Sequence, residues 1–490
     1  MNNRPPSQEK TPLLDALRAS AQKPHAAFYA PGHKQGKGIP EPLADLLGKS
    51  VFRADLPELP ELDNLFAPEG VIQEAQDLAA AAFGASKTWF LVNGSTCGVM
   101  AAILATCYTG EKILLPRNIH QSAIAGLVLC GAIPIFINPE YDPSTDLVYS
   151  ITPTAVNQAL NQHPDTKAVM MVYPTYQGIC GDIKAIAKIV HQHNIPLLVD
   201  EAHGPHFAFH PDLPLDALSA GADLTVQSTH KVIGAMTQAS MLHIQGHRID
   251  AQRLSKALQL VQSTSPSYLL LASLDAARQQ MALHGERLMS RTLQLAQDAR
   301  SKISEIPGLS VFEPIKPLRF QDLDPTRLTI RVTELGLSGF EADEILHQQL
   351  GVTAELPTLH HLTFIISLGN TQRDIQQLVQ AFTKLAQNND NSSTKQPAFC
   401  NLQPATGNLQ TLLSPREAFF AATETLPVTE TINRISAELI CPYPPGIPAL
   451  MPGEQIKSTT IEYLQKILTL GGQITGCSDP SLKTLKVIIE

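Results

Sequence analysis

The sequence predicts an α/β fold with a mostly parallel sheet covered by helices on both faces. Short apolar runs of strand length alternate along the chain with segments whose apolar residues recur at helical spacing. Because these runs are continuously apolar, both faces of the sheet are expected to be buried. The seven runs are Thr88–Val92, Lys112–Leu115, Ile133–Ile137, Ala168–Val172, Pro196–Val199, Leu224–Gln227 and Ala239–Ile244.

Before and between these strands, the period of 3.6 residues predicts helices. The first 50 residues predict an irregular arm with one helix, at about Leu13–Gln22. The helices that follow are expected at Val71–Phe83, Thr96–Tyr108, Ser122–Cys130 and Ile183–His193.

After the seventh run the pattern changes. Residues 255–305 predict long helices, among them Tyr268–Ser290. Residues 310–385 mix strands with helices, which is typical of a smaller α+β domain. Its strands are expected at Leu328–Val332 and Leu362–Ile366, and its helices at Glu341–Leu350 and Asp374–Leu385.

With 490 residues the chain exceeds a single hydrophobic core, so several domains are expected. The polar run Gln387–Pro397 is rich in Asn and Ser and predicts a flexible linker. The predicted division is an N-terminal arm at 1–50, a major domain at 51–305, a small α+β domain at 306–385, a linker at 386–411 and a C-terminal domain at 412–490.

Composition excludes several classes of partner. The formal net charge of −9 argues against nucleic acid or an anionic membrane as the main partner. The polar start Met1–Lys10 does not resemble a secretory signal, and the longest apolar stretch, Ser122–Ile137, is too short and interrupted to cross a bilayer. None of the seven cysteines stands at CxxC spacing, so reduced thiols in a cytoplasmic protein without a metal site are expected.

An acid and a lysine stand at the ends of neighbouring apolar runs. Asp200 ends one run, and Lys231 closes Ser228-Thr229-His230-Lys231 just after the next. A pyridoxal 5'-phosphate (PLP) enzyme needs this arrangement, because the lysine holds the cofactor as a Schiff base and the acid keeps the ring nitrogen protonated. Taken alone, Asp200 could equally be a turn or helix-capping residue.

Other candidates for a PLP site lie between residues 93 and 231. In Asn93–Gly98, the amides of Ser95 and Thr96 open a predicted helix and can point at a phosphate, although a simple N-cap has the same pattern. His120 could lie flat on the pyridine ring, or be an ordinary loop histidine. The remaining candidates are Ala202 against the ring, His203 at the phenolic oxygen, and Ser228 and His230 at the phosphate.

Together these elements resemble the prokaryotic ornithine/lysine/arginine decarboxylase family, which has the aspartate aminotransferase fold (fold type I). The resemblance extends from residue 31 to residue 454, in the expected order. Its segments are Pro31–Lys34, Leu62–Leu65, Pro68–Gly70, Asn93–Cys97, Arg117–His120, Asp200–Gly204, Ser228–Lys231, Gln238–Met241, Ser263–Pro266, Cys441–Pro448 and Met451–Glu454.

The resemblance implies a PLP-binding major domain in which Lys231 carries PLP, Asp200 faces the ring nitrogen, His120 stacks on the ring, and Ser95, Thr96, Ser228 and His230 hold the phosphate. It also implies a homodimer or higher homo-oligomer with its active site at the subunit interface, where Thr264 reaches the neighbour's phosphate. The activity expected is decarboxylation of a basic amino acid, with Lys231 or His203 returning a proton to the α-carbon.

Substrate choice is open at this point. Arginine, giving agmatine, is favoured because the chain resembles the short biosynthetic branch; lysine and ornithine are the alternatives. Glu454 in the Pro- and Gly-rich Cys441–Glu454 segment is predicted to seat the substrate's distal cation, although the segment could instead be a packing loop. An aminotransferase or aldolase of the same fold, or an inactive regulatory homologue, are alternatives of another class.

Overall fold

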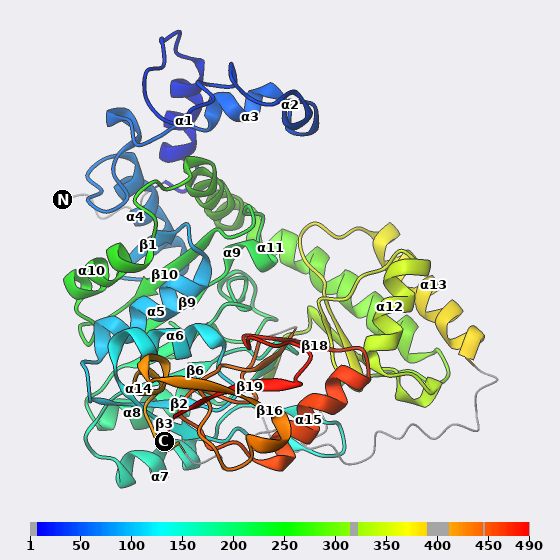
Figure 1. Cartoon of the computed structure of the whole chain (residues 1–490). Helices are drawn as coiled ribbons and strands as arrows, with labels where there is room; N and C mark the ends of the chain where they lie inside the picture. The colour runs from blue at the N-terminus through cyan, green and yellow to red at the C-terminus, as the bar shows by residue number, and fades with distance from the viewer. Residues whose placement is uncertain (1–6, 314–321, 390–410, 444–445, 490) are drawn as a thin grey trace. The chain divides into compact units, whose positions relative to one another are not determined.

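The computed structural model describes residues 7–313, 322–389, 411–443 and 446–489 (Figure 1). Seven strands form one sheet in the order β1-β10-β9-β8-β6-β2-β3, which confirms the predicted α/β fold class. Strand β10 runs antiparallel to both of its neighbours, whereas β8 and β9, β2 and β6, and β2 and β3 pair in parallel. The strands are β1 (Lys87–Leu91), β2 (Lys112–Pro116), β3 (Ile133–Ile137), β6 (Thr166–Val172), β8 (Leu197–Asp200), β9 (Leu224–Gln227) and β10 (Ser240–Ile244).

All seven predicted strands are present. Each apolar run is long enough to span the sheet, and β1, β8, β9 and β10 are buried on both faces, whereas the edge strand β3 is partly exposed. The helices in and around this sheet are α4 (Val71–Phe83), α5 (Gly94–Thr106), α6 (Gln121–Cys130), α7 (Pro153–Gln162), α8 (Ile183–Gln192), α9 (Thr229–Val232), α10 (Ala251–Val261) and α11 (Tyr268–Ser304). The short strand pairs are β4 (Tyr141–Asp142) with β5 (Leu147–Val148), and β7 (Ile179–Cys180) with β12 (Asp322–Leu323).

Gly98 lets α5 pack closely on the sheet. A Cβ at this position would lie 2.6 Å from Val226 Cγ1 and 2.8 Å from Leu91 Cδ1, closer than real Cβ contacts come. Only glycine fits without moving the helix away from β1 and β9, so this residue sets how near the N-terminus of α5 lies to the strand ends.

The arm is more helical than predicted. Beside α1 (Pro12–Gln22), it contains α2 (Glu41–Leu47), and α3 (Lys49–Ala54) begins before residue 50. A proline near the start of α2 and Gly48 at its end are helix boundary signals. The prediction of a single helix in the arm did not take them into account. Helix α7 was also not predicted, although Thr152 caps it and its apolar residues Val156 and Leu160 are spaced four apart.

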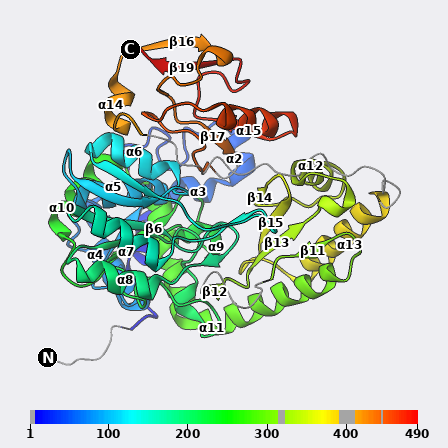
Figure 2. The ribbon, with the colours of Figure 1, turned by 90° about the horizontal axis from the view of Figure 1, so that it is seen from below.

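The chain forms two compact units, residues 1–105 with 198–289 and residues 106–197 with 290–490. Each unit combines two separate stretches of the chain, whereas the predicted domains are continuous in sequence. The predicted domain boundaries remain a prediction. In the second unit, α12 (Gly339–Gln349) and α13 (Gln372–Asn389) lie beside a four-stranded sheet (Figure 2). Its order is β11 (Ser310–Val311), β13 (Arg327–Arg331), β15 (His361–Ile365) and β14 (Leu356–Pro357).

The predicted C-terminal domain has a core of its own, built around Ile440, Leu464 and Val487. Its elements are α14 (Pro415–Phe420), β16 (Thr423–Pro427), β17 (Cys441–Tyr443), α15 (Ser458–Thr469), β18 (Gln473–Thr475) and β19 (Thr484–Ile488). Most of the predicted linker, like Pro444 and Pro445 of the predicted substrate segment, lies outside the described residues. Within the described residues, every helix is too short or too polar to span a bilayer.

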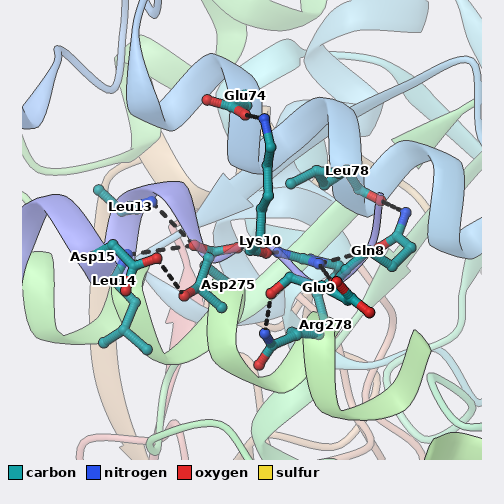
Figure 3. Close-up of polar contacts among 12 residues, drawn as sticks. Gln8, Glu9, Lys10, Leu13, Leu14, Asp15, Glu74, Leu78, Asp275 and Arg278 are labelled. Atoms are coloured by element: carbon teal, nitrogen blue, oxygen red, sulfur yellow. Dashed lines mark hydrogen bonds and ion pairs between the residues drawn. The ribbon is translucent and has the colours of Figure 1, made fainter. Parts of the chain in front are cut away.

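A buried ion pair on α11 holds the N-terminal segment of the first unit (Figure 3). Arg278 and Asp275 are both fully buried, with Nη2 of the arginine 2.5 Å from Oδ1 of the aspartate. Arg278 also donates to the carbonyl oxygens of Gln8 and Lys10, and Asp275 Oδ2 accepts the amides of Leu13 and Leu14. Asp275 therefore caps the N-terminus of α1 from a residue far along the chain.

Replacement of Asp275 by Ala is expected to lower the thermal unfolding midpoint, because it leaves the Arg278 charge buried without its partner, at a cost of roughly 3–5 kcal/mol. A thermal melt compares this variant with Glu74→Ala, which removes the exposed Lys10–Glu74 ion pair shown in the same view and is expected to change the midpoint little. Equal midpoints for the two variants would contradict this account of the ion pair.

Candidate active site

In the first unit, Asp200 and Lys231 follow two neighbouring parallel strands. Asp200 is the last residue of β8, and Lys231 lies in the short helix α9 directly after β9. Since the carboxyl ends of parallel strands meet at one edge of a sheet, both side chains lie at that edge, where α/β enzymes bind ligands. The Lys231 amine is 2.9 Å from Nε2 of His203, within hydrogen-bonding distance.

Asp200 is a buried carboxylate that faces a cation. The residue is 6% exposed, and its Oδ1 accepts the amide of Ala202 at 3.2 Å. Burial raises the pKa of Asp200, and the positive charge of Lys231 acts in the opposite direction. Such a carboxylate is suited to hold a proton on a cationic ring nitrogen, because the pair removes the cost of a lone buried charge.

Hydroxyl groups converge where helix α5 begins. Ser228 Oγ donates to Ser95 Oγ at 2.7 Å, which joins the loop after β9 to the first turn of α5. The first amides of a helix lack partners within the helix, so those of Ser95 and Thr96 suit an anion. The Thr229 hydroxyl is buried and lacks a hydrogen-bond partner among the described residues.

His230 and Thr264 lie in the same unit with different surroundings. The His230 imidazole Nδ1 is 3.0 Å from the carbonyl oxygen of Ala239, and burial lowers the pKa of this histidine. Thr264 is exposed, and its neighbour Ser263 donates its amide to Asn93 Oδ1 at 3.1 Å. The Thr264 loop is thus tied to the Asn93–Cys97 loop of its own chain; its contact with a partner's phosphate stays a prediction.

In the second unit, His120 caps α6. Its Nδ1 accepts the amide of Ser122 at 3.2 Å. A Cβ at Gly446 would lie 3.3 Å from Gln121 Nε2 and 3.7 Å from His120 Nε2. This contact brings the Cys441–Glu454 segment beside the loop that carries the predicted stacking residue. The same loop borders a cavity of about 180 Å³ whose walls are mainly apolar, among them Leu147, Phe340 and Ile447.

Glu454 is buried against Arg117. The carboxylate is 1% exposed, and its Oε2 lies 3.0 Å from Arg117 Nη2 and accepts the amide of Met451 at 2.7 Å. Arg117 also donates to the carbonyl oxygens of Pro448 and Ala449. Glu454 therefore already has a cationic partner in its own chain, and its contact with a substrate cation stays a prediction.

Family models cover both parts of the chain. The model of the Orn/Lys/Arg decarboxylase major domain matches residues 11–374, and that of the Orn/Lys/Arg decarboxylase C-terminal domain matches residues 404–479. The chain belongs to the Orn/Lys/Arg decarboxylase family. It is a basic amino-acid decarboxylase, as the resemblance implied, and the family is one of PLP-dependent enzymes.

Similar proteins of this family match the whole chain. The arginine decarboxylase of Halalkalibacterium halodurans is 40% identical, and the match covers 99% of this chain and 98% of that protein. The arginine decarboxylase of Bacillus subtilis (strain 168) is 39% identical, and the match covers 99% of each. The crystal structure of the Francisella novicida lysine decarboxylase shares the fold, with a TM-score of 0.85, 22% identity, and coverage of 98% of this chain and 81% of that one.

Sequence reasoning singled out the candidate site residues one by one but did not foresee how they are held. The structure brings together Asp200, Ala202, His203 and Lys231, and joins Ser95 to Ser228. The Arg117–Glu454 pair was not foreseen, since its partners stand 337 residues apart.

Proposed function

We propose that this decarboxylase uses PLP to convert L-arginine to agmatine and CO2. The choice of arginine is supported by the two similar proteins at 39–40% identity, both named arginine decarboxylases and matched over nearly their full length. Lysine is the second candidate. Its support is the likeness in fold to a lysine decarboxylase, which carries less weight because the two sequences are only 22% identical.

One observation gives the main support for PLP as the cofactor. The Lys231 amine lies 2.9 Å from Nε2 of His203, and its positive charge acts to lower the pKa of the buried Asp200 carboxylate. This set fits a cofactor with an aldehyde and a cationic ring nitrogen. The other roles follow the same proposal: Ser95, Thr96, Ser228 and His230 would hold the phosphate, Ala202 would lie against the ring, His120 would stack on it, and Thr264 would come from a partner subunit.

The chain's own residues do the following work in the proposed reaction. Lys231 would hold the cofactor through its amine, and His203 can exchange a proton with Lys231 Nζ. Asp200 holds the proton on the ring nitrogen, so that the positive charge persists in the buried site. When bound, PLP would supply an electron sink for the α-carbon of the substrate. Lys231 or His203 then returns a proton to that carbon.

The proposal extends to the assembly and its location. We expect a homodimer or higher homo-oligomer with the site at the subunit interface. We also expect a cytoplasmic enzyme; in support, the six cysteines in the described part of the chain are not joined in disulfides, as is usual in a reducing compartment.

The test is CO2 release by the purified protein with added PLP, measured separately on arginine, lysine and ornithine, with the amine product identified. We expect agmatine from arginine, with kcat/KM at least about tenfold above the other two substrates, a difference of about 1.4 kcal/mol between transition states. Preferred turnover of lysine or ornithine would overturn the choice of substrate. A keto acid or aldehyde product would overturn the reaction, and a protein that takes up no PLP would point to the inactive homologue.

A further inference from the structure

Glu201, the residue after Asp200, has no part in the proposed reaction and is fully buried. Its amide donates to the carbonyl oxygen of Val226, which extends the pairing of β8 with β9 by one residue. Its carboxyl oxygens accept two hydrogen bonds, each 2.8 Å long, one from the Ala217 amide and one from Gln227 Nε2. The side chain therefore ties the end of β8 to the end of β9.

The hydrogen bonds continue across two more strands. His243 on β10 lies with Nε2 3.2 Å from Gln227 Oε1, and its Nδ1 lies 2.7 Å from the hydroxyl of Thr88 on β1. Burial lowers the pKa of His243 to about 3, so the ring is neutral and has one donor and one acceptor. Because Gln227 Nε2 donates to Glu201, its Oε1 accepts from His243, and His243 accepts from Thr88.

The relay Thr88–His243–Gln227–Glu201 joins four adjacent strands, β1, β10, β9 and β8. Each strand leads to part of the proposed cofactor site in this unit. Strand β1 precedes the first turn of α5, which carries Ser95 and Thr96, Gln227 is followed by Ser228, and Glu201 follows Asp200. Strand β10 follows Ala239, whose carbonyl oxygen contacts His230.

The charge state of Glu201 bears on Asp200. Burial raises the pKa of Glu201 well above its usual value, and the nearby Asp216 carboxylate raises it further. Both effects favour the uncharged form of Glu201. A second negative charge one residue from Asp200 would favour protonation of Asp200 and weaken its hold on a cationic ring nitrogen.

Gly204 leaves room for this side chain. A Cβ at residue 204 would lie 2.8 Å from Glu201 Cγ, and the Gly204 amide donates to the Glu201 carbonyl oxygen. The run Asp200–Gly204 therefore supplies the acid, its buried neighbour and the space for that neighbour.

We propose that Glu201 is a positioning residue for the cofactor site: through its hydrogen bonds to Ala217 and Gln227 at the end of the relay, it fixes the strand ends that carry Asp200 and Ser228. Its uncharged form leaves Asp200 as the negative group at the ring nitrogen. The inference rests on the proposed binding of PLP and adds to it a residue that never touches the cofactor.

The first experiment compares PLP dissociation constants of Glu201→Ala and Glu201→Gln, read from the visible absorption of bound PLP. We expect Glu201→Ala to weaken PLP binding about tenfold or more, the effect of leaving one buried hydrogen-bonding group unpaired. Glu201→Gln should recover most of that loss, since it has the same shape and no charge, and the Gln227 amide and the His243 ring can reverse their hydrogen bonds together. The exposed Glu41→Ala variant is the matched control.

The second experiment needs no cofactor. The folded apoprotein keeps the Glu201 proton up to the raised pKa, whereas the unfolded chain loses it near its ordinary pKa, so this residue makes stability fall as pH rises between the two values. Glu201→Gln has no such proton. Its unfolding midpoint should therefore rise relative to the wild type as the pH increases above the ordinary pKa of a glutamate.

Three results would overturn the inference. They are wild-type PLP affinity in Glu201→Ala, PLP binding in Glu201→Gln as weak as in Glu201→Ala, and a midpoint difference that stays constant with pH. If Glu201→Ala does not fold, Gln227→Met interrupts the same relay, is expected to weaken PLP binding similarly, and overturns the inference if it does not. If the wild type itself takes up no PLP, the proposed function fails, whereas the pH dependence of the apoprotein still tests the neutral state of Glu201.

Discussion

The Lys231→Ala variant is expected to lose turnover altogether and to lack the visible absorption band of PLP bound to the wild type. The amine removed is the group that would bond to the cofactor, and its neighbour His203 cannot replace it because an imidazole forms no comparable bond to an aldehyde. Absorption spectra and CO2 release on the same preparation measure both effects.

The matched control is Lys256→Ala, which removes an exposed lysine from the same unit. It should keep both the band and the rate. Full activity in Lys231→Ala, or loss of the band in the control variant as well, would refute the assignment of Lys231.

The second large effect is expected from Asp200→Ala. Lys231 remains, so the visible band of bound PLP should persist, but kcat should fall by roughly 10²–10³-fold, the usual loss when one preorganised electrostatic partner is removed. The cause is that the ring nitrogen loses the buried carboxylate that holds its proton, and the ring then accepts electrons poorly. Steady-state kinetics at saturating PLP separate this effect from weaker cofactor binding.

Asp212→Ala provides the comparison, since its side chain is 80% exposed in the same unit and lies outside the proposed site. A rate for Asp200→Ala within a few-fold of this control would exclude the role at the ring nitrogen.

The seven strands could be predicted because a fully buried strand is a continuous apolar run, a pattern local to the sequence. The same holds for Asp200 and Lys231, whose places follow from the ends of two such runs. Helix α11 was predicted to end near Ser290 but continues to Ser304, since no proline or glycine interrupts the chain between these residues.

Pairings across the fold could not be read from the sequence. The Arg117–Glu454 and the Thr88–His243 contacts join residues 337 and 155 positions apart, and each depends on strand register or domain packing. The role of Glu454 was predicted from its charge alone, whereas its burial beside Arg117 follows from packing that no local pattern encodes. The relay through Gln227 depends on the antiparallel register of β9 with β10.

The most direct test of the account is to identify the residue that bears the cofactor. Borohydride reduction of the protein incubated with PLP, followed by digestion and mass spectrometry, locates the modified lysine. The account predicts one pyridoxyl group per chain, on the peptide that contains Lys231. Modification of another lysine, or none at all in a protein that still releases CO2 from arginine, would contradict it.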